Sequence, residues 1–447
     1  MTVVTVKTKA EQQLLAQFEQ VAAKLPGAGW VKDARRAAIG AFAASGLPHR
    51  KMEAWKYTDL RALLKEAYPP RIPGTTKIDE ALLLKALGPE LAGLKSIRLV
   101  FVDGMFAAGA AGPNYGLGTD YHLLPLADAL GANGFDWMQA SFGNTGATKD
   151  DATLALNAAF VTDGITLRVV EGVRLQHPIH LIYLSTATAP AAASTRNLIR
   201  IETGARAAIL ESHISSTGIA HQSNSVTGLH ICQGAHAEHL QLVTKGPQAT
   251  HLGNWIVSID KGATYNAFQM TESVALARHQ LFVTFNGEGA AFNFNAALLG
   301  RGKSHIDTTM VIDHAVPKCT SRELLKCVLD GEARGVFQGK VIVRPDAQKS
   351  DGKQMAKALL LSPNAEFDSK PELEIYADDV ICGHGSTVAE LDGDQVFYLR
   401  ARGIPEAQAR ALLIEAFVAE TVDAIENEQI REAMRARLTA WLAGGAK

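Results

Sequence analysis

Cysteine is scarce in this sequence, with four residues in a chain of 447. So few thiols exclude a disulfide framework, and no two of them form a Cys-x-x-Cys motif. The N-terminus lacks the layout of a signal peptide. No uninterrupted apolar run reaches the ~18 residues of a membrane span. We therefore expect a cytoplasmic protein with reduced thiols and no membrane partner.

An excess of one sign of charge is also missing. The chain has 44 Lys and Arg residues against 46 Asp and Glu residues, a formal net charge of −2. Nucleic-acid binding needs a basic surface, so this balance argues against it. Hydrophobic residues make up 47% of the chain and charged residues 20%. This is ordinary globular usage and excludes a wholly disordered chain.

Both ends of the chain carry helical patterns. Apolar residues recur every three or four positions near the N-terminus and again from Ala409 to Phe417, which is typical of helices with one buried face. The middle is rich in strand-like alternation. We predict an organisation with a helical domain at 1–94, mixed structure at 95–164, a β-rich core at 165–400 and a helical domain at 401–447.

A repeated glycine turn identifies the kind of β structure. The turn glycines Gly204, Gly234, Gly262 and Gly289 are spaced by 30, 28 and 27 residues, each before a strand. Repeats of this length favour a parallel β-helix, in which every coil stacks on its neighbours. The alternative is a β-sandwich, whose turns recur every ~8–12 residues. The longer repeat favours the mainly β, parallel β-helix fold.

Two local motifs do not support ligand binding. Gly302-Lys303-Ser304 lacks the earlier glycine of a phosphate-binding loop, because that position is Ala297. We therefore expect no ATP site in this chain. Cys232, His236 and His239 have a spacing that suits zinc, but a strand would place the two histidines on opposite faces.

Cys382 and His384 form the strongest local candidate for a site. Residues i and i+2 of a strand share one face, so the thiol and the imidazole would lie side by side. Asp378 would join them if the strand continued without a bulge. Thiolate and imidazole are iron and zinc ligands, but two ligands leave a site incomplete. The alternative is a free cysteine packed in the core beside a corner histidine.

Residues 370–388 (KPELEIYADDVICGHGSTV) resemble the signature of the SufB/SufD family of iron–sulfur cluster assembly proteins. Residues 397–404 (FYLRARGI) and 53–58 (EAWKYT) extend the resemblance to both ends of the chain. The sequence is closer to the SufD branch, because it lacks the N-terminal cysteine pair often found in SufB.

The resemblance implies a right-handed parallel β-helix between helical ends and a non-catalytic scaffold role. It implies pairing with a SufB-like chain, or with a second copy when isolated. It also implies binding of the ATPase SufC, which would hydrolyse ATP for the complex. An iron–sulfur cluster or iron would bind only transiently, at His384 with Cys382 beside it. The residues expected to dock SufC are Pro405, Leu412, Leu413, Glu415 and Phe417.

Two other functions stay open at the level of sequence. A β-helix carbohydrate-active enzyme would need a secretion signal and a row of acids, and neither is evident. A SufB-like scaffold would hold the cluster within one chain, which four scattered cysteines argue against.

Overall fold

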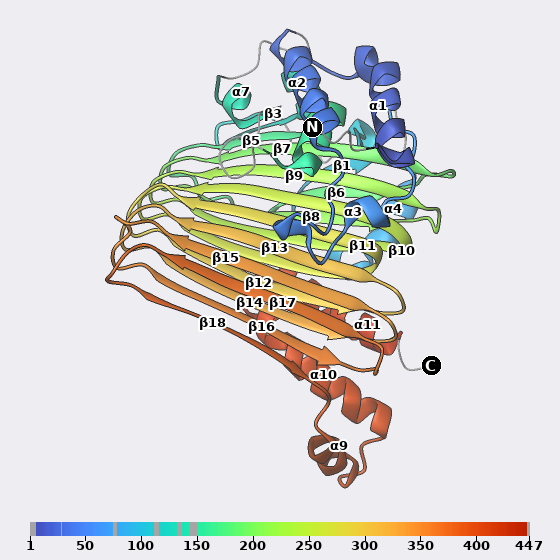
Figure 1. The fold of residues 1–447 in the computed structure, drawn as a ribbon, viewed down its shortest axis with the longest axis vertical. Helices are drawn as coiled ribbons and strands as arrows, with labels where there is room; N and C mark the ends of the chain where they lie inside the picture. The colour runs from blue at the N-terminus through green and yellow to red at the C-terminus, as the bar shows by residue number, and fades with distance from the viewer. Residues whose placement is uncertain are drawn as a thin grey trace.

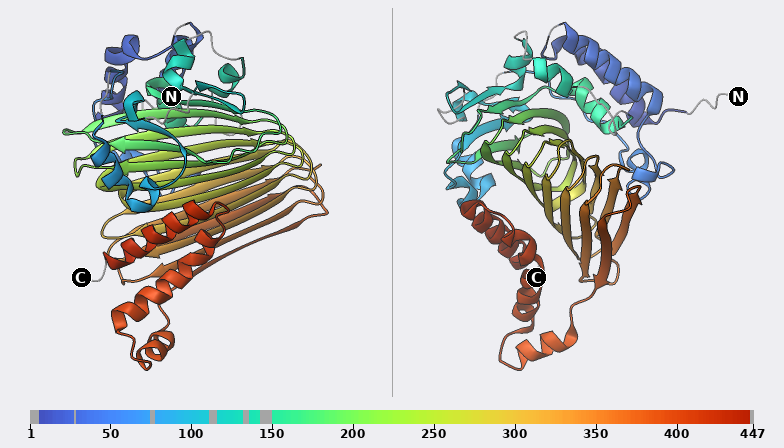
Figure 2. Two further views of the ribbon diagram at one scale, coloured as in Figure 1. Left: turned by 180° about the vertical axis from the view of Figure 1, so that it is seen from behind. Right: turned by 90° about the vertical axis from the view of Figure 1, so that its left-hand side faces the viewer.

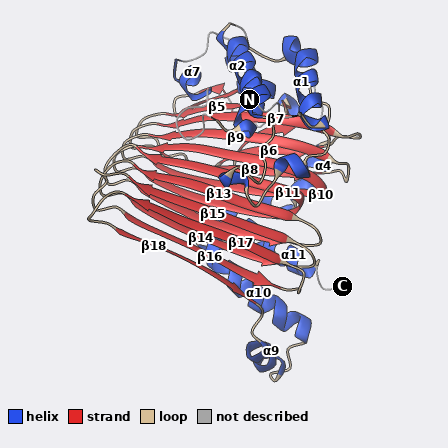
Figure 3. Ribbon diagram, viewed as in Figure 1, coloured by secondary structure: helices blue, strands red, loops and turns tan. Residues whose placement is uncertain are grey.

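The computed structural model describes residues 6–27, 29–74, 78–110, 116–131, 136–142 and 150–444. Most of this chain forms a parallel β-helix of about 8 turns, with helices gathered at one end and along one side (Figures 1 and 3). The expected mainly β fold, a parallel β-helix with helical ends, is confirmed. No helix within the described residues is long and apolar enough to cross a membrane.

Helices lie toward both ends of the described chain, and a long series of strands lies between them. The helices are α1 (Lys9–Val21), α2 (Trp30–Ser45), α3 (Leu60–Leu63), α4 (Glu80–Leu87), α5 (Pro89–Ala92), α6 (Leu126–Gly131), α7 (Asp136–Phe142), α8 (Ala152–Phe160), α9 (Gly393–Arg400), α10 (Glu406–Asp423) and α11 (Glu428–Ala443). The strands are β1 (Ile97–Val102), β2 (Met105–Phe106), β3 (Gly116–Leu117), β4 (Tyr121–Pro125), β5 (Asp163–Val169), β6 (Ile179–Ser185), β7 (Ala191–Ile201), β8 (Arg206–Ser215), β9 (His221–Ile231), β10 (His236–Ile259), β11 (Thr264–Phe285), β12 (Ala291–Gly300), β13 (His305–His314), β14 (Thr320–Leu329), β15 (Arg334–Val343), β16 (Asp351–Leu360), β17 (Glu366–Ile375) and β18 (Ile381–Ala389).

Two parallel sheets make the walls of the β-helix. The sheet against which the C-terminal helices pack is called the tail-side sheet. Its strands are, in order, β6, β8, the first halves of β10 and β11, and then β12, β14, β16 and β18. The sheet against which residues of the N-terminal region pack is called the head-side sheet. Its strands are, in order, β5, β7, β9, the second halves of β10 and β11, and then β13, β15 and β17. Alternate residues of both sheets face the lumen between them, where they form one continuous apolar cluster.

The predicted glycine turns are the corners where coils stack. Gly204, Gly234, Gly262 and Gly289 all have positive φ, a conformation that costs glycine little. The Gly204 N–H donates to Gln233 O (2.9 Å), so each corner also bonds to the next. Lys318 and Lys349 occupy the same left-handed conformation at later corners.

Helices α10 and α11 cover part of the outer face of the tail-side sheet, whereas α9 projects beyond its end (Figure 2). Ile414, Val418 and Trp441 join one apolar cluster with outward-facing residues of that sheet. Polar contacts add to this packing: Arg206 Nη2 lies 2.6 Å from Glu426 Oε2, and Arg437 pairs with the buried Glu272. The helical tail starts at α9, ahead of the boundary expected at residue 401.

The segment 53–58 packs on the outer face of the head-side sheet. Trp55 is buried, and the Arg278 guanidinium lies 3.8 Å from the centre of its ring. The Ala54 carbonyl oxygen accepts hydrogen bonds from Arg278 Nη2 (2.7 Å) and Gln338 Nε2 (3.1 Å). The motif therefore ties the N-terminal region to successive coils.

Candidate functional site

The β-helix is open at its C-terminal end. Strand β18 pairs with β16 on one side, and β17 pairs with β15 on one side; neither has a partner strand on its other edge among the described residues. Unpaired edges of this kind are templates for another chain. Large apolar side chains are exposed around the opening, at Ile375, Tyr376, Ile381 and Val388.

Cys382 and His384 lie on β18 at this opening. They alternate with Gly383 and stand in register with Gly352 and Gln354, which face the lumen. The expected placement on one face of a strand is therefore confirmed. Cys382 is half-buried against the lumen cluster, whereas His384 is exposed.

Asp378 does not join this pair. The strand begins only at Ile381, and Asp378 lies in the connection that leads from β17 to it. The sequence expectation assumed an extended backbone from Asp378 onward, and the corner between coils interrupts it.

Cys382 and His384 offer two side chains of metal-ligating type, fewer than a tetrahedral metal site needs. Burial raises the pKa of the Cys382 thiol, so the thiol stays protonated until a metal ion displaces its proton. No third His, Cys, Asp or Glu ligand completes a compact group with Cys382 and His384 among the described residues. Any tetrahedral iron bound here would need ligands from elsewhere.

Two buried polar residues continue this row into the lumen. Glu323 of β14 stands in register with Gln354 of β16, and Gln354 stands in register with His384. Burial raises the pKa of Glu323 to about 8. Neither Glu323 carboxylate oxygen nor Gln354 Oε1 has a hydrogen-bond partner among the described residues.

A groove of about 700 Å³ runs along the outer face of the tail-side sheet to the same strand. It lies between this sheet and the connection from α10 to α11, and it ends at Cys382, Gly383 and His384. Its wall carries side chains that bind polar groups, including Asn266, Asn293, Arg322 and Lys353. The groove therefore reaches the strand that carries the Cys382/His384 pair on its lumen face.

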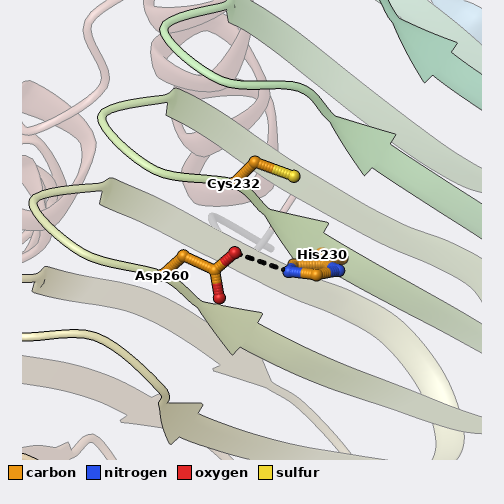
Figure 4. Close-up of side chains that lie close together, drawn as sticks. All are labelled: His230, Cys232 and Asp260. Atoms are coloured by element: carbon orange, nitrogen blue, oxygen red, sulfur yellow. Dashed lines mark hydrogen bonds and ion pairs between the residues drawn. The ribbon is translucent and has the colours of Figure 1, made fainter.

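A second group of metal-ligating side chains lies at a corner of the head-side sheet. Ligand atoms of His230, Cys232 and Asp260 lie within 4.8 Å of one another (Figure 4). Both ring nitrogens of His230 are already bonded, Nε2 to Asp260 (2.9 Å) and Nδ1 to the Arg200 guanidinium (2.8 Å). A metal ion bound to Nε2 would leave the ring proton on Nδ1, where it would face the Arg200 cation. We therefore interpret this group as a hydrogen-bond network rather than a metal site.

The positions of His236 and His239 agree with the argument from the sequence against a zinc site. His236 faces outward and bonds to Glu426 Oε2 (3.0 Å). His239 faces the lumen, where its Nε2 lies 2.9 Å from Glu211 Oε1. The two histidines lie on opposite faces, as expected.

Sequence reasoning missed a polar cluster in the lumen. Burial acts against the charged form of Glu211, but hydrogen bonds from His213 and His239 hold the pKa of its carboxyl group well below the ordinary value. On the His239 row, Ala267 and Phe294 separate this cluster from Glu323. Only the register of the coils shows that these polar residues face inward, so the sequence carries no local signal for them.

The predicted docking residues lie on and beside α10. Pro405 is the N-cap of α10 and is exposed, and Leu412 is exposed. Leu413 and Glu415 are half-buried. Phe417 packs inward, with the Lys326 ammonium 4.9 Å from its ring centre.

Comparison with known proteins covers nearly the whole chain. Residues 8–181 match the family model described as the SufBD protein N-terminal region. Residues 183–417 match the model described as SUF system FeS cluster assembly, SufBD core domain. The chain belongs to the SufB/SufD family.

Individual relatives point to the SufD branch of that family. The iron–sulfur cluster assembly protein SufD of Escherichia coli (strain K12) is 30% identical over 412 residues, which cover 90% of this chain and 91% of that protein. A SufBD family protein of Synechocystis is 29% identical, covering 96% of this chain and 95% of its own. The chloroplastic protein ABCI7 of Arabidopsis thaliana is 28% identical over 64% of this chain and 62% of its own. The assignment made from the sequence motifs is confirmed.

Proposed function

We propose that this chain is a non-catalytic scaffold subunit of the SUF system for iron–sulfur cluster assembly. The observation that carries the proposal is the open coil, which presents Cys382 and His384 beside an unpaired strand edge. Two donors cannot fill the ligand positions of a cluster iron. The remaining ligands would come from a second chain, and the iron or nascent cluster would be cargo held between the two.

The second chain in this proposal is a SufB-like β-helix that pairs with the free edge of β18. The exposed apolar side chains at the opening would be covered by such a partner. In an isolated preparation, a second copy of this chain would take the same place. Co-expression with a SufB-like chain and the SufC ATPase, followed by purification on a tag carried by this chain, tests the assignment. Recovery of a complex of all three supports it, and recovery of this chain without either partner contradicts it.

An Ile381→Lys/Val388→Lys double variant is expected to weaken pairing with the SufB-like chain at least about tenfold. Lysines at a strand edge oppose edge-to-edge association, because their charges resist burial. Both side chains are exposed, so the fold itself should persist. Size-exclusion chromatography of the co-expressed chains measures the loss. Leu117→Lys, at an exposed leucine on β3, is the matched control and should pair normally.

The SufC ATPase would dock on the exposed side of α9 and α10. Phe397 and Tyr398 of α9 and Leu412 of α10 are exposed, although neighbouring apolar residues of α10 are buried against the sheet. Removing the whole tail would uncover the sheet beneath Ile414 and Val418. Single exposed residues therefore give a sharper test than truncation.

A Leu412→Asp variant is expected to lower SufC affinity about tenfold or more, which corresponds to about 1.4 kcal/mol. Its melting temperature should stay close to that of the unmodified chain, because the side chain is exposed. Titration of SufC by calorimetry gives the affinity. Leu84→Asp, at an exposed leucine of α4, controls for added charge on a helix surface. Equal losses in both variants would reject the docking surface.

A further inference from the structure

We infer that a divalent metal ion binds inside the open end of the β-helix, on Glu323 and Gln354. Gln354 lies one strand inward from His384, and Glu323 lies two strands inward, on the same lumen-facing row. The inference rests on the proposed function, because it gives the iron cargo an inner binding position behind the Cys382/His384 pair.

Burial without partners is the first observation. The side chains of Glu323 and Gln354 are 3% and 2% exposed, and three of their oxygen atoms accept no hydrogen bond within the described chain. The Ser321 hydroxyl, two positions before Glu323 on the same face, acts to lower the pKa of Glu323, but its hydrogen bond goes to His314 Nε2 (3.1 Å). A buried acceptor left without a partner is unfavourable, so such groups call for a ligand.

The orientation of Gln354 is the second observation. Its Nε2 donates across the lumen to the Glu372 carbonyl oxygen of β17 (3.4 Å), which fixes the amide with Oε1 as its free atom. A Cβ at Gly339, on the facing wall, would lie 2.0 Å from Oε1. Glycine at this position therefore leaves the space that the amide oxygen occupies.

The charge around the row indicates a cation as the missing ligand. The free atoms are three oxygens, which suit a metal ion, and a bound cation would displace the proton that the buried Glu323 carboxyl group holds near neutral pH. Arg322 lies beside Glu323 in sequence but faces outward, and its Nη2 bonds to Asp351 Oδ2 (2.6 Å). Lys353 also lies near Asp351, with Nζ 3.8 Å from Oδ1. Both cations form their ion pairs with Asp351, and neither pairs directly with the Glu323 carboxyl group among the described residues.

Neighbouring strands of a sheet are spaced by ~4.8 Å. His384, Gln354 and Glu323 therefore offer imidazole nitrogen, amide oxygen and carboxylate oxygen at successive steps into the lumen. An ion accepted at the opening reaches the inner oxygens by moving along this row. No oxidation or bond transfer is required, since binding exchanges water ligands for protein ligands.

The test uses the full chain and ferrous ion added anaerobically, with bound Fe²⁺ measured by equilibrium dialysis. Glu323→Gln is expected to weaken Fe²⁺ binding at least about tenfold, because it removes the charged ligand and keeps the shape. Glu332→Gln removes an exposed corner carboxylate and is the matched control. Gln354→Met, which keeps the side-chain length, should also weaken binding and serves if Glu323→Gln folds poorly.

Unchanged Fe²⁺ binding in both Glu323→Gln and Gln354→Met would overturn the inner site. In the reconstituted complex, normal cluster assembly by these variants together with loss in His384→Ala would reject this inference and leave the proposed function intact. Normal assembly by His384→Ala would instead count against the proposed function itself.

Discussion

A His384→Ala variant is expected to fold normally and to lose at least about tenfold of the cluster assembly rate in the reconstituted complex. The side chain is exposed at the opening of the β-helix, so its removal leaves the packed lumen intact. It supplies one of the two donors that this chain presents there. Loss of a ligand or of its support typically costs 10–100-fold in metal affinity or activity.

The measurement is the growth of iron–sulfur absorbance under anaerobic conditions, with the SufB-like chain and SufC present. His177→Ala is the control, because His177 is also exposed but lies in a turn before β6. A His384→Ala complex that assembles clusters at the full rate would remove this residue from the site. Cys382→Ala, measured in parallel, separates a ligand role of the thiol from its role in lumen packing.

The second large effect concerns stability. Gly287→Ala is expected to lower the free energy of unfolding by about 3 kcal/mol, the upper end of the usual overpacking cost. A Cβ at this corner would lie 2.0 Å from the backbone nitrogen of Lys261 and 2.4 Å from its Cα, in the preceding coil. Backbone atoms cannot rotate away, so the stacked corners would have to separate.

Gly289, two residues later in the same turn, provides the matched comparison. Its φ is +68°, but a Cβ there would meet nothing within 4 Å. Gly289→Ala should therefore cost only the strain of a left-handed alanine, about 1 kcal/mol. Urea unfolding of both variants measures the difference. Similar losses at the two positions would show that backbone strain, rather than coil contact, governs the corner.

The β-helix fold was predictable because each coil contains the same kind of turn, which leaves the same pattern in the sequence once per coil. Gly204, Gly234, Gly262 and Gly289 mark corners that need the same backbone conformation, and each occurs once per coil. The glycine pattern misses later corners where lysine replaces glycine, as at Lys318 and Lys349. Side chain identity indicates a left-handed corner only when the residue is one that favours it.

The candidate site was predictable only in part. The two-residue period of a strand correctly places Cys382 beside His384, whereas Asp378 fails because the chain turns between them. Glu323 and Gln354 lie far from His384 in sequence. They become its neighbours through coil register alone, which no local pattern encodes.

The packing of the C-terminal helices has a consequence for how the molecule unfolds. In a simple stack of coils, each coil touches only its neighbours, and the ends can fray independently. Here Glu426 pairs with Arg206 of β8, Arg437 pairs with Glu272 of β11, and Lys326 of β14 pairs with Glu420. The two C-terminal helices and the connection between them thus join early coils directly to late coils, so we expect these coils to unfold in one cooperative transition. The last strand, β18, lies outside the region that these helices connect.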